Sequence, residues 1–136
     1  MKIIIPMAST DKDMLDNYSV IKPLVKLGNK TMIETFIKNC KFNFEYIFLC
    51  KQQDLLETKL LNIIQKLKIK KKIVAIKKDT TSVIETISFA KKYIKLNEQV
   101  LICHPDNINL FFSKNELHKK LKTPNADGLL FAYDED

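Results

Sequence analysis

The sequence predicts an α/β domain with a doubly wound, mainly parallel sheet of about five strands and helices on both faces. Three observations support this prediction. Short apolar runs alternate along the chain with segments of helical periodicity. The run Val100–Cys103 is apolar throughout, as expected for a strand of a parallel sheet that is buried on both faces. Three segments also carry the capping-box pattern that begins a helix.

The first quarter of the chain predicts a strand followed by a long connection. Lys2–Met7, which is dominated by isoleucine, is the first strand, and a polar loop is expected over Ala8–Ser19. The segment Val20–Leu27 is expected to be extended because Pro23 disfavours helix in the residue before it. Gly28-Asn29 predicts a turn.

The middle of the chain predicts two helices around a second strand. Thr31 and Glu34 form the first capping box, and its helix should end near Asn39 or Cys40. Glu45–Cys50 is the second strand, and Gln53–Lys68 has the clearest helical periodicity in the chain. The apolar face of this second helix is formed by Leu56, Leu60, Ile63, Ile64 and Leu67.

The rest of the chain continues the alternation. The expected elements are a strand over Ile73–Ile76, a helix opened by Ser82 and Glu85, the strand Val100–Cys103, a helix from Ser113 to about Leu121, and a fifth strand over Asp127–Tyr133. The apolar face of the helix after Ser82 is expected to carry Val83, Ile87, Ala90 and Ile94.

If the first three strands build outward on one side, the strand order is 3-2-1-4, a Rossmann-like arrangement. The loop after Met7 and the acid Asp106 then face each other across the crevice where such sheets bind ligands. Asp106 therefore holds a divalent cation or a ligand hydroxyl, or it caps a turn after Pro105.

Composition excludes several classes of protein. A length of 136 residues suits one domain, and no apolar run approaches the ~20 residues of a membrane span. The net charge is +7, but all 23 basic residues are lysine, which argues against a nucleic-acid partner because arginine is the usual reader of phosphates and bases. The run from Lys68 to Lys72 is interpreted as a solvated loop or as protection of an edge strand against pairing with another chain.

We expect a cytoplasmic protein without a membrane partner, with Cys40, Cys50 and Cys103 as buried thiols.

Three segments resemble the sugar-phosphate nucleotidyltransferase family, specifically its N-terminal, nucleotide-binding half, whose fold is that of the nucleotide-diphospho-sugar transferases. Ile3–Ala8 resembles the opening strand, and Lys22–Glu34 resembles the lysine-proline-leucine segment with its glycine turn. The stretch from Thr80 to Asp106 resembles the nucleotide-contacting helix and the strand that leads to the metal-binding aspartate.

The resemblance implies transfer of a nucleoside monophosphate from a nucleoside triphosphate to a sugar phosphate or similar phosphorylated acceptor, with release of pyrophosphate. The implied catalytic residues are Lys22 and Lys12, and Asp106 is the implied ligand of Mg²⁺. The implied nucleotide-binding residues are Ala8, Ser9, Thr10, Thr80, Thr81, Ser82 and His104. From the residues alone, Lys22 is equally compatible with an exposed cation, and Thr81 and Ser82 with a helix cap. A homodimer is a further expectation.

The chain also departs from the family pattern. The loop after Ala8 has neither the glycines nor the arginine of the family, and Ser82 replaces another glycine. The single domain, residues 1–136, is expected to lack the acceptor-binding C-terminal half. An inactive nucleotide-binding or scaffolding module of the same fold is therefore the alternative function, and a metal-dependent glycosyltransferase is a third.

Overall fold

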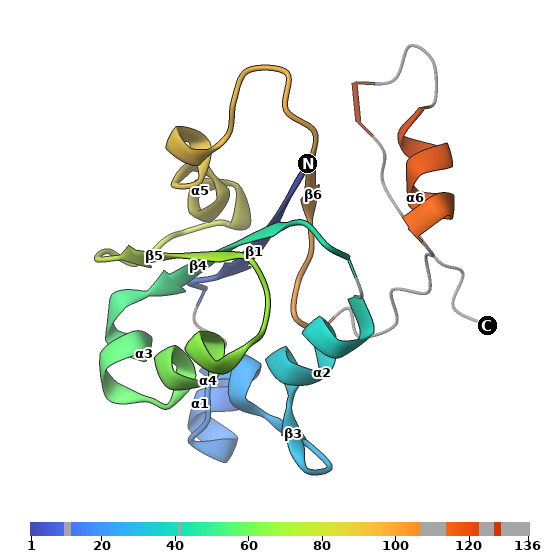
Figure 1. The fold of residues 1–136 in the computed structure, drawn as a ribbon. Coiled ribbons are helices and arrows are strands. Elements are labelled where there is room, and N and C mark those ends of the chain that lie inside the picture. The colour runs from blue at the N-terminus through green and yellow to red at the C-terminus, as the bar shows by residue number, and fades with distance from the viewer. Residues whose placement is uncertain (10–11, 41, 107–113, 123–126, 129–136) are drawn as a thin grey trace, which may run out of the picture.

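A computed structural model describes residues 1–9, 12–40, 42–106, 114–122 and 127–128 of the chain (Figure 1). Its centre is a four-stranded sheet with the order β5-β4-β1-β6. The strands are β1 (Lys2–Met7), β4 (Glu45–Lys51), β5 (Lys71–Ile76) and β6 (Val100–Ile102), and all neighbouring pairs are parallel. These are the first four strands expected from the sequence, so the predicted order 3-2-1-4 is confirmed.

Strand β1 is one of the two inner strands of this sheet, together with β4. It pairs with β4 along its whole length, from Lys2 opposite Glu45 to Met7 opposite Cys50. On its other side the residues from Lys2 to Ile4 pair with β6. The isoleucines of β1 are fully buried, as expected for a parallel strand covered on both faces.

The prediction that Val100–Cys103 is buried on both faces is only half correct. Leu101 and Cys103 are buried, but the side chain of Ile102 is 46% exposed. The reason is that β6 is a three-residue strand paired with β1 alone among the strands of the described residues. The fifth strand expected from Asp127 falls almost entirely outside the residues that the structure describes.

Apolar side chains pack on both faces of the sheet. On one face the helices are α2 (Met32–Cys40), α3 (Gln52–Glu57) and α4 (Leu60–Lys66), and on the other the helix is α5 (Val83–Ser88), as Figure 1 shows. The first face buries Ile3, Ile5, Ile33, Phe36, Tyr46, Phe48, Leu60 and Ile64. The second face buries Ile4, Ile47, Leu49, Val74, Ile76 and Ala90.

Helix α2 begins with the predicted capping box. The amide of Thr31 donates to the Glu34 carboxylate at 2.8 Å, and the amide of Glu34 donates back to the Thr31 hydroxyl at 3.4 Å. Helix α2 ends at Cys40, as the sequence predicts. It is preceded by a hairpin of β2 (Lys26–Leu27) and β3 (Lys30–Thr31), in which Gly28 takes a positive φ of 65° at the predicted turn.

The single long helix predicted over Gln53–Lys68 is wrong, because the chain breaks it at Thr58 into α3 and α4. The backbone of Thr58 is extended, with φ −123° and ψ 177°. Its hydroxyl donates to the carbonyl of Asp54 at 2.5 Å and accepts from the amide of Leu60 at 3.1 Å, so one side chain ends α3 and caps α4. The break also leaves Leu56, a predicted core residue, 73% exposed, while Leu55 is buried.

The loop predicted over Ala8–Ser19 contains a helix instead, α1 (Lys12–Tyr18). This stretch has no glycine or proline to interrupt it. Ser19 ends the helix in the left-handed conformation, with φ 50°, and its amide donates to the carbonyl of Leu15 at 3.0 Å.

The helix after Ser82 is shorter than predicted. Helix α5 ends at Ser88 and a 3₁₀ turn, η2 (Lys91–Tyr93), follows it. The buried face of α5 carries Thr86 in place of the predicted Val83, and the side chain of Val83 is partly exposed. Helix α6 (Lys114–Leu121) lies where a helix is predicted, and its expected cap at Ser113 falls outside the described residues.

We predict that Thr58→Ala lowers the free energy of unfolding by about 1 kcal/mol, because it removes the cap of α4 and the bond to Asp54. Urea denaturation followed by circular dichroism measures this change. Thr58→Ser, which keeps the hydroxyl, is the control and should lose less than half as much. An increase in stability in Thr58→Ala would show that the hydroxyl is not what separates α3 from α4.

Candidate functional site

A cleft of about 600 Å³ lies at the carboxyl edge of the parallel sheet. It is lined by residues at the ends of β1, β4 and β6 and by the segment around Pro23. The polar side chains that matter for its chemistry are Ser9, Lys22, Lys51, Asp54, His104 and Asp106. Open α/β sheets bind their ligands at this position, outside the carboxyl ends of the strands and at the point where the strand order reverses.

Lys22 and Asp106 meet in this cleft. The Lys22 ammonium lies 2.8 Å from Oδ2 of Asp106, and their side chains are 41% and 37% exposed. Lys22 opens a 3₁₀ turn, η1 (Lys22–Leu24), in which Pro23 occupies an early helical position and the amide of Val25 donates to the Lys22 carbonyl. The sequence therefore anticipates correctly that these two residues converge.

The charge of Lys22 determines the protonation of Asp106. Partial burial acts to raise the pKa of the carboxyl group, but the hydrogen bond and the positive charge of Lys22 outweigh it, and the pKa of Asp106 is lowered. Because both side chains remain more than one-third exposed, the pair contributes at most about 1 kcal/mol to stability.

A second pair of charges, which the sequence-based prediction missed, borders the same cleft. Lys51 is the last residue of β4, and its ammonium contacts the carboxylate of Asp79, which follows β5. Asp54, in the first turn of α3, lies near this pair. Burial is the largest cause that raises the pKa of Asp54, Lys51 partly opposes it, and the charges of Glu57 and Asp79 add to it. The available signal was a lysine directly after the apolar run Tyr46–Cys50, at the carboxyl end of a predicted buried strand.

The remaining predicted site residues are placed differently from one another. Ser9 and His104 line the cleft. Ala8 is buried in the apolar cluster on the α5 face of the sheet. Lys12 begins α1, but its side chain lies outside the part of the chain that the structure describes, as does Thr10.

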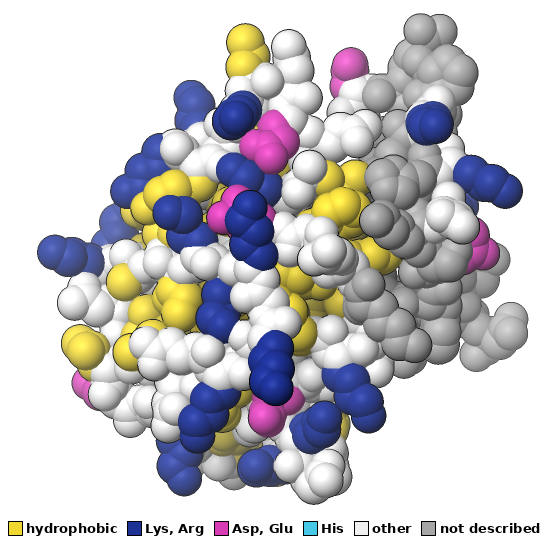
Figure 2. Space-filling view, viewed as in Figure 1, with side chains coloured by type: hydrophobic (Ala, Val, Ile, Leu, Met, Phe, Trp, Pro, Cys, Tyr) yellow, Lys and Arg dark blue, Asp and Glu magenta, His cyan; other side chains and the backbone are white. Residues whose placement is uncertain are grey.

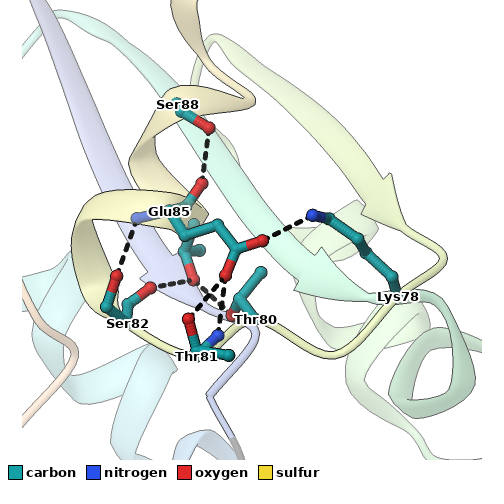
Figure 3. Close-up of polar contacts among 7 residues, drawn as sticks. Lys78, Thr80, Thr81, Ser82, Glu85 and Ser88 are labelled. Atoms are coloured by element: carbon teal, nitrogen blue, oxygen red, sulfur yellow. Dashed lines mark hydrogen bonds and ion pairs between the residues drawn. The ribbon is translucent and has the colours of Figure 1, made fainter.

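Thr80, Thr81 and Ser82 directly precede α5 (Figure 3) and are not among the described residues that line the cleft. The Ser82 hydroxyl accepts from the amide of Glu85 at 3.1 Å, which is an N-terminal cap. The Glu85 carboxylate accepts from the amide and the hydroxyl of Thr81, at 2.8 and 3.0 Å. The Thr80 hydroxyl lies 2.7 Å from that of Thr86, which in turn donates to the carbonyl of Ser82.

Asp106 offers a single carboxylate to a metal ion. The described residues include no group of three histidine, cysteine, aspartate or glutamate side chains arranged to hold one. Mg²⁺ commonly binds through one or two carboxylates together with waters and substrate phosphates. Asp106 therefore fits Mg²⁺ when a phosphorylated ligand supplies the other oxygens, and the contact with Lys22 must loosen for this to happen.

A scan against protein-family models and a search of the curated proteins find no match for this chain. Fold and cleft together define the protein as an α/β domain with a parallel sheet and a charged cleft at its carboxyl edge. No helix in the described ranges is both long and apolar enough to cross a bilayer.

We predict that Glu85 makes the protein acid-sensitive in a defined range. The hydrogen bond from Lys78, followed by those from the amide and hydroxyl of Thr81, lowers the pKa of Glu85 from 4.5 to about 2. A group with a lowered pKa in the folded state stabilises the fold above its unfolded pKa, and this contribution is lost as the pH falls through the folded value. Urea denaturation at several pH values should therefore show wild type more stable than Glu85→Gln at neutral pH, with the difference shrinking between about pH 4.5 and 2.

The matched control is Asp16→Asn, which changes an exposed carboxylate in α1. It should show a smaller difference from wild type over that range. A difference between wild type and Glu85→Gln that stays constant from pH 7 to 2 would contradict the proposed role of the Thr81 and Lys78 contacts.

Proposed function

We propose that the protein is a nucleotidyltransferase-like domain that transfers a nucleoside monophosphate from a nucleoside triphosphate to a sugar phosphate or similar phosphorylated acceptor, with release of pyrophosphate. The observation that carries the proposal is the meeting of Lys22 and Asp106 in one cleft at the carboxyl edge of the sheet. A cation for phosphate and a carboxylate for a metal, side by side, are what binding of a triphosphate with Mg²⁺ requires. In this proposal the sheet is completed by a fifth strand and is doubly wound in the Rossmann-like manner.

The proposed reaction requires the protein to align the reacting groups and to neutralise their negative charge. It requires no covalent intermediate on the protein. An acceptor phosphate oxygen attacks the α-phosphorus, a new P–O bond forms, and the bond to the bridging oxygen breaks so that pyrophosphate leaves with the electron pair. Lys22 holds phosphate oxygens as a point charge and offsets the negative charge that develops on them. Lys12, implied by the resemblance, would add a second ammonium group, and Asp106 would hold Mg²⁺, which polarises the phosphoryl oxygens when bound.

Lys51 extends this arrangement to the neighbouring strand. It lies at the end of β4 and lines the same cleft as Lys22. The two ammonium groups are carried by different walls of the cleft, which suits a ligand with several phosphates. Ser9 and His104 also line the cleft and are proposed to contact the nucleotide.

A non-catalytic nucleotide-binding or scaffolding module is the second candidate. The specific observation in its favour is that both cleft lysines already contact carboxylates, Asp106 and Asp79. A loop without the family's glycines and arginine points in the same direction.

The cysteines support a reducing compartment. Cys40, Cys50 and Cys103, all within the described part of the chain, are buried and form no disulfide. Burial raises the pKa of each thiol, to about 12 at Cys103, which keeps the thiols protonated and unreactive. We infer a cytoplasmic location, where nucleoside triphosphates are also found.

The decisive experiment mixes the protein with each nucleoside triphosphate, Mg²⁺ and a panel of phosphorylated acceptors, and measures pyrophosphate release and thermal stabilisation. We predict release with at least one pair, and a loss of about 100-fold or more in kcat/KM in Asp106→Asn and in Lys22→Met. Stabilisation by the nucleotide without any release of pyrophosphate would favour the binding module. The absence of both stabilisation and release would contradict both candidates.

Matched variants separate a loss of function from a loss of folding. Asp127→Asn and Lys38→Met change exposed residues of the same types outside the cleft and should leave release unchanged. Asp106→Asn should unfold within about 1 kcal/mol of wild type in urea because its ion pair is half exposed. Unchanged release in Asp106→Asn would remove Asp106 from the metal-binding role.

A further inference from the structure

The positive charge of the chain is concentrated in one segment. Residues 68–95 contain nine lysines and two acidic residues, a net charge of +7, which equals the net charge of the whole chain. The remaining residues are therefore neutral in sum. This segment contains β5, α5 and η2, which lie together on one side of the molecule (Figure 1).

The fold brings the lysines of the strand and of the 3₁₀ turn onto one surface. The ammonium groups of Lys72 and Lys92 lie 4.6 and 5.0 Å from the ring centre of Tyr93. Lys78 lies 5.7 Å from the ring centre of Phe89. Figure 2 shows dark blue side chains with yellow ones between them over the side of the molecule where α5 lies. We call this surface, formed by Lys72, Lys78, Phe89, Lys91, Lys92, Tyr93 and Lys95, the basic face.

The acidic residues of the segment neutralise only Lys78 of the basic face. Glu85 is held by Lys78, and Asp79 is held by Lys51 of the cleft. No ion pair with a described residue is found for Lys72, Lys91, Lys92 or Lys95, and all four are exposed. A cluster of like charges in water repels itself, so an anionic surface is the complementary partner.

Two large apolar side chains are strongly exposed within this segment or directly after it. Leu96, directly after Lys95, is 93% exposed, and Ile84 on α5 is 80% exposed. Asn97 takes a positive φ of 64°, which makes a turn immediately after Leu96. An exposed leucine directly after a lysine matches the combination of apolar insertion and charge attraction by which proteins lie on a membrane surface.

We propose that the basic face binds the surface of an anionic lipid bilayer, with its lysines against the headgroups and Leu96 inserted between them. Lysine clusters of this size are typical of surfaces that bind anionic lipids. A nucleic acid is the less suitable partner because the chain has no arginine to grip phosphates or read bases. The sequence shows where the lysines are concentrated, and the fold shows that Lys72 of β5 and Lys92 of η2 flank one ring, that of Tyr93.

The test is sedimentation of the protein with vesicles of phosphatidylcholine that contain about 30% phosphatidylserine, compared with pure phosphatidylcholine vesicles. We predict binding to the anionic vesicles alone, and binding about 100-fold weaker in the variant Lys91→Gln, Lys92→Gln, Lys95→Gln, because each lysine near the surface contributes about fivefold. Leu96→Asn should weaken binding by about tenfold while leaving the charge unchanged.

The matched control is Lys38→Gln, Lys59→Gln, Lys122→Gln, which removes three exposed lysines elsewhere and gives the same net charge. It should bind within about fivefold of wild type. Equal losses in the two triple variants, or no preference for anionic vesicles, would overturn the proposal. So would binding to a single-stranded oligonucleotide that depends on the same three lysines, if the protein leaves the vesicles unbound. Asp106→Asn should bind vesicles like wild type, which keeps this test independent of the cleft.

Discussion

The pairing of β1 with strands on both sides is the constraint on which the other features of the molecule depend. Its isoleucines are fully buried and contribute to both apolar clusters, so a change in its register would exchange the side chains of the two faces. The parallel register also places the ends of β1, β4 and β6 at one edge. Met7, Lys51 and Pro105 can border one cleft only because these strands end side by side.

Opposite charges in contact are the distinctive property of that cleft. Ion pairs as exposed as Lys22–Asp106 are worth about 0–1 kcal/mol, so a ligand breaks them at little cost. In the proposed reaction a triphosphate takes the place of Asp106 at Lys22, and Asp106 becomes available to a cation that arrives with the phosphates. The same exchange explains how a cleft with carboxylates at its border can accept an anionic ligand.

Features set by local chemistry could be predicted from the sequence, and features set by tertiary contacts could not. The capping box of Thr31 and Glu34 and the turn at Gly28 depend on neighbouring residues alone, and both are present. The convergence of Lys22 and Asp106 followed from the strand order, which short parallel crossovers restrict to few possibilities. The break at Thr58 gives no signal in the apolar periodicity, because a threonine on a helix surface is common and only its two hydrogen bonds reveal its role.

The two positive regions of the molecule act on ligands at separate ranges. The cleft lysines Lys22 and Lys51 each contact a carboxylate, so their field is largely cancelled beyond the cleft and acts on a ligand only at contact. Among described residues, no carboxylate pairs with Lys72, Lys91, Lys92 or Lys95 of the basic face, and at physiological salt their field extends over a Debye length of about 8 Å. Under the two proposals, a flat anionic surface therefore meets the basic face first, and a small phosphorylated ligand is selected by the geometry of the cleft rather than by the net charge of the protein. In that case the surface and the soluble ligand bind to separate regions of one small domain and do not compete.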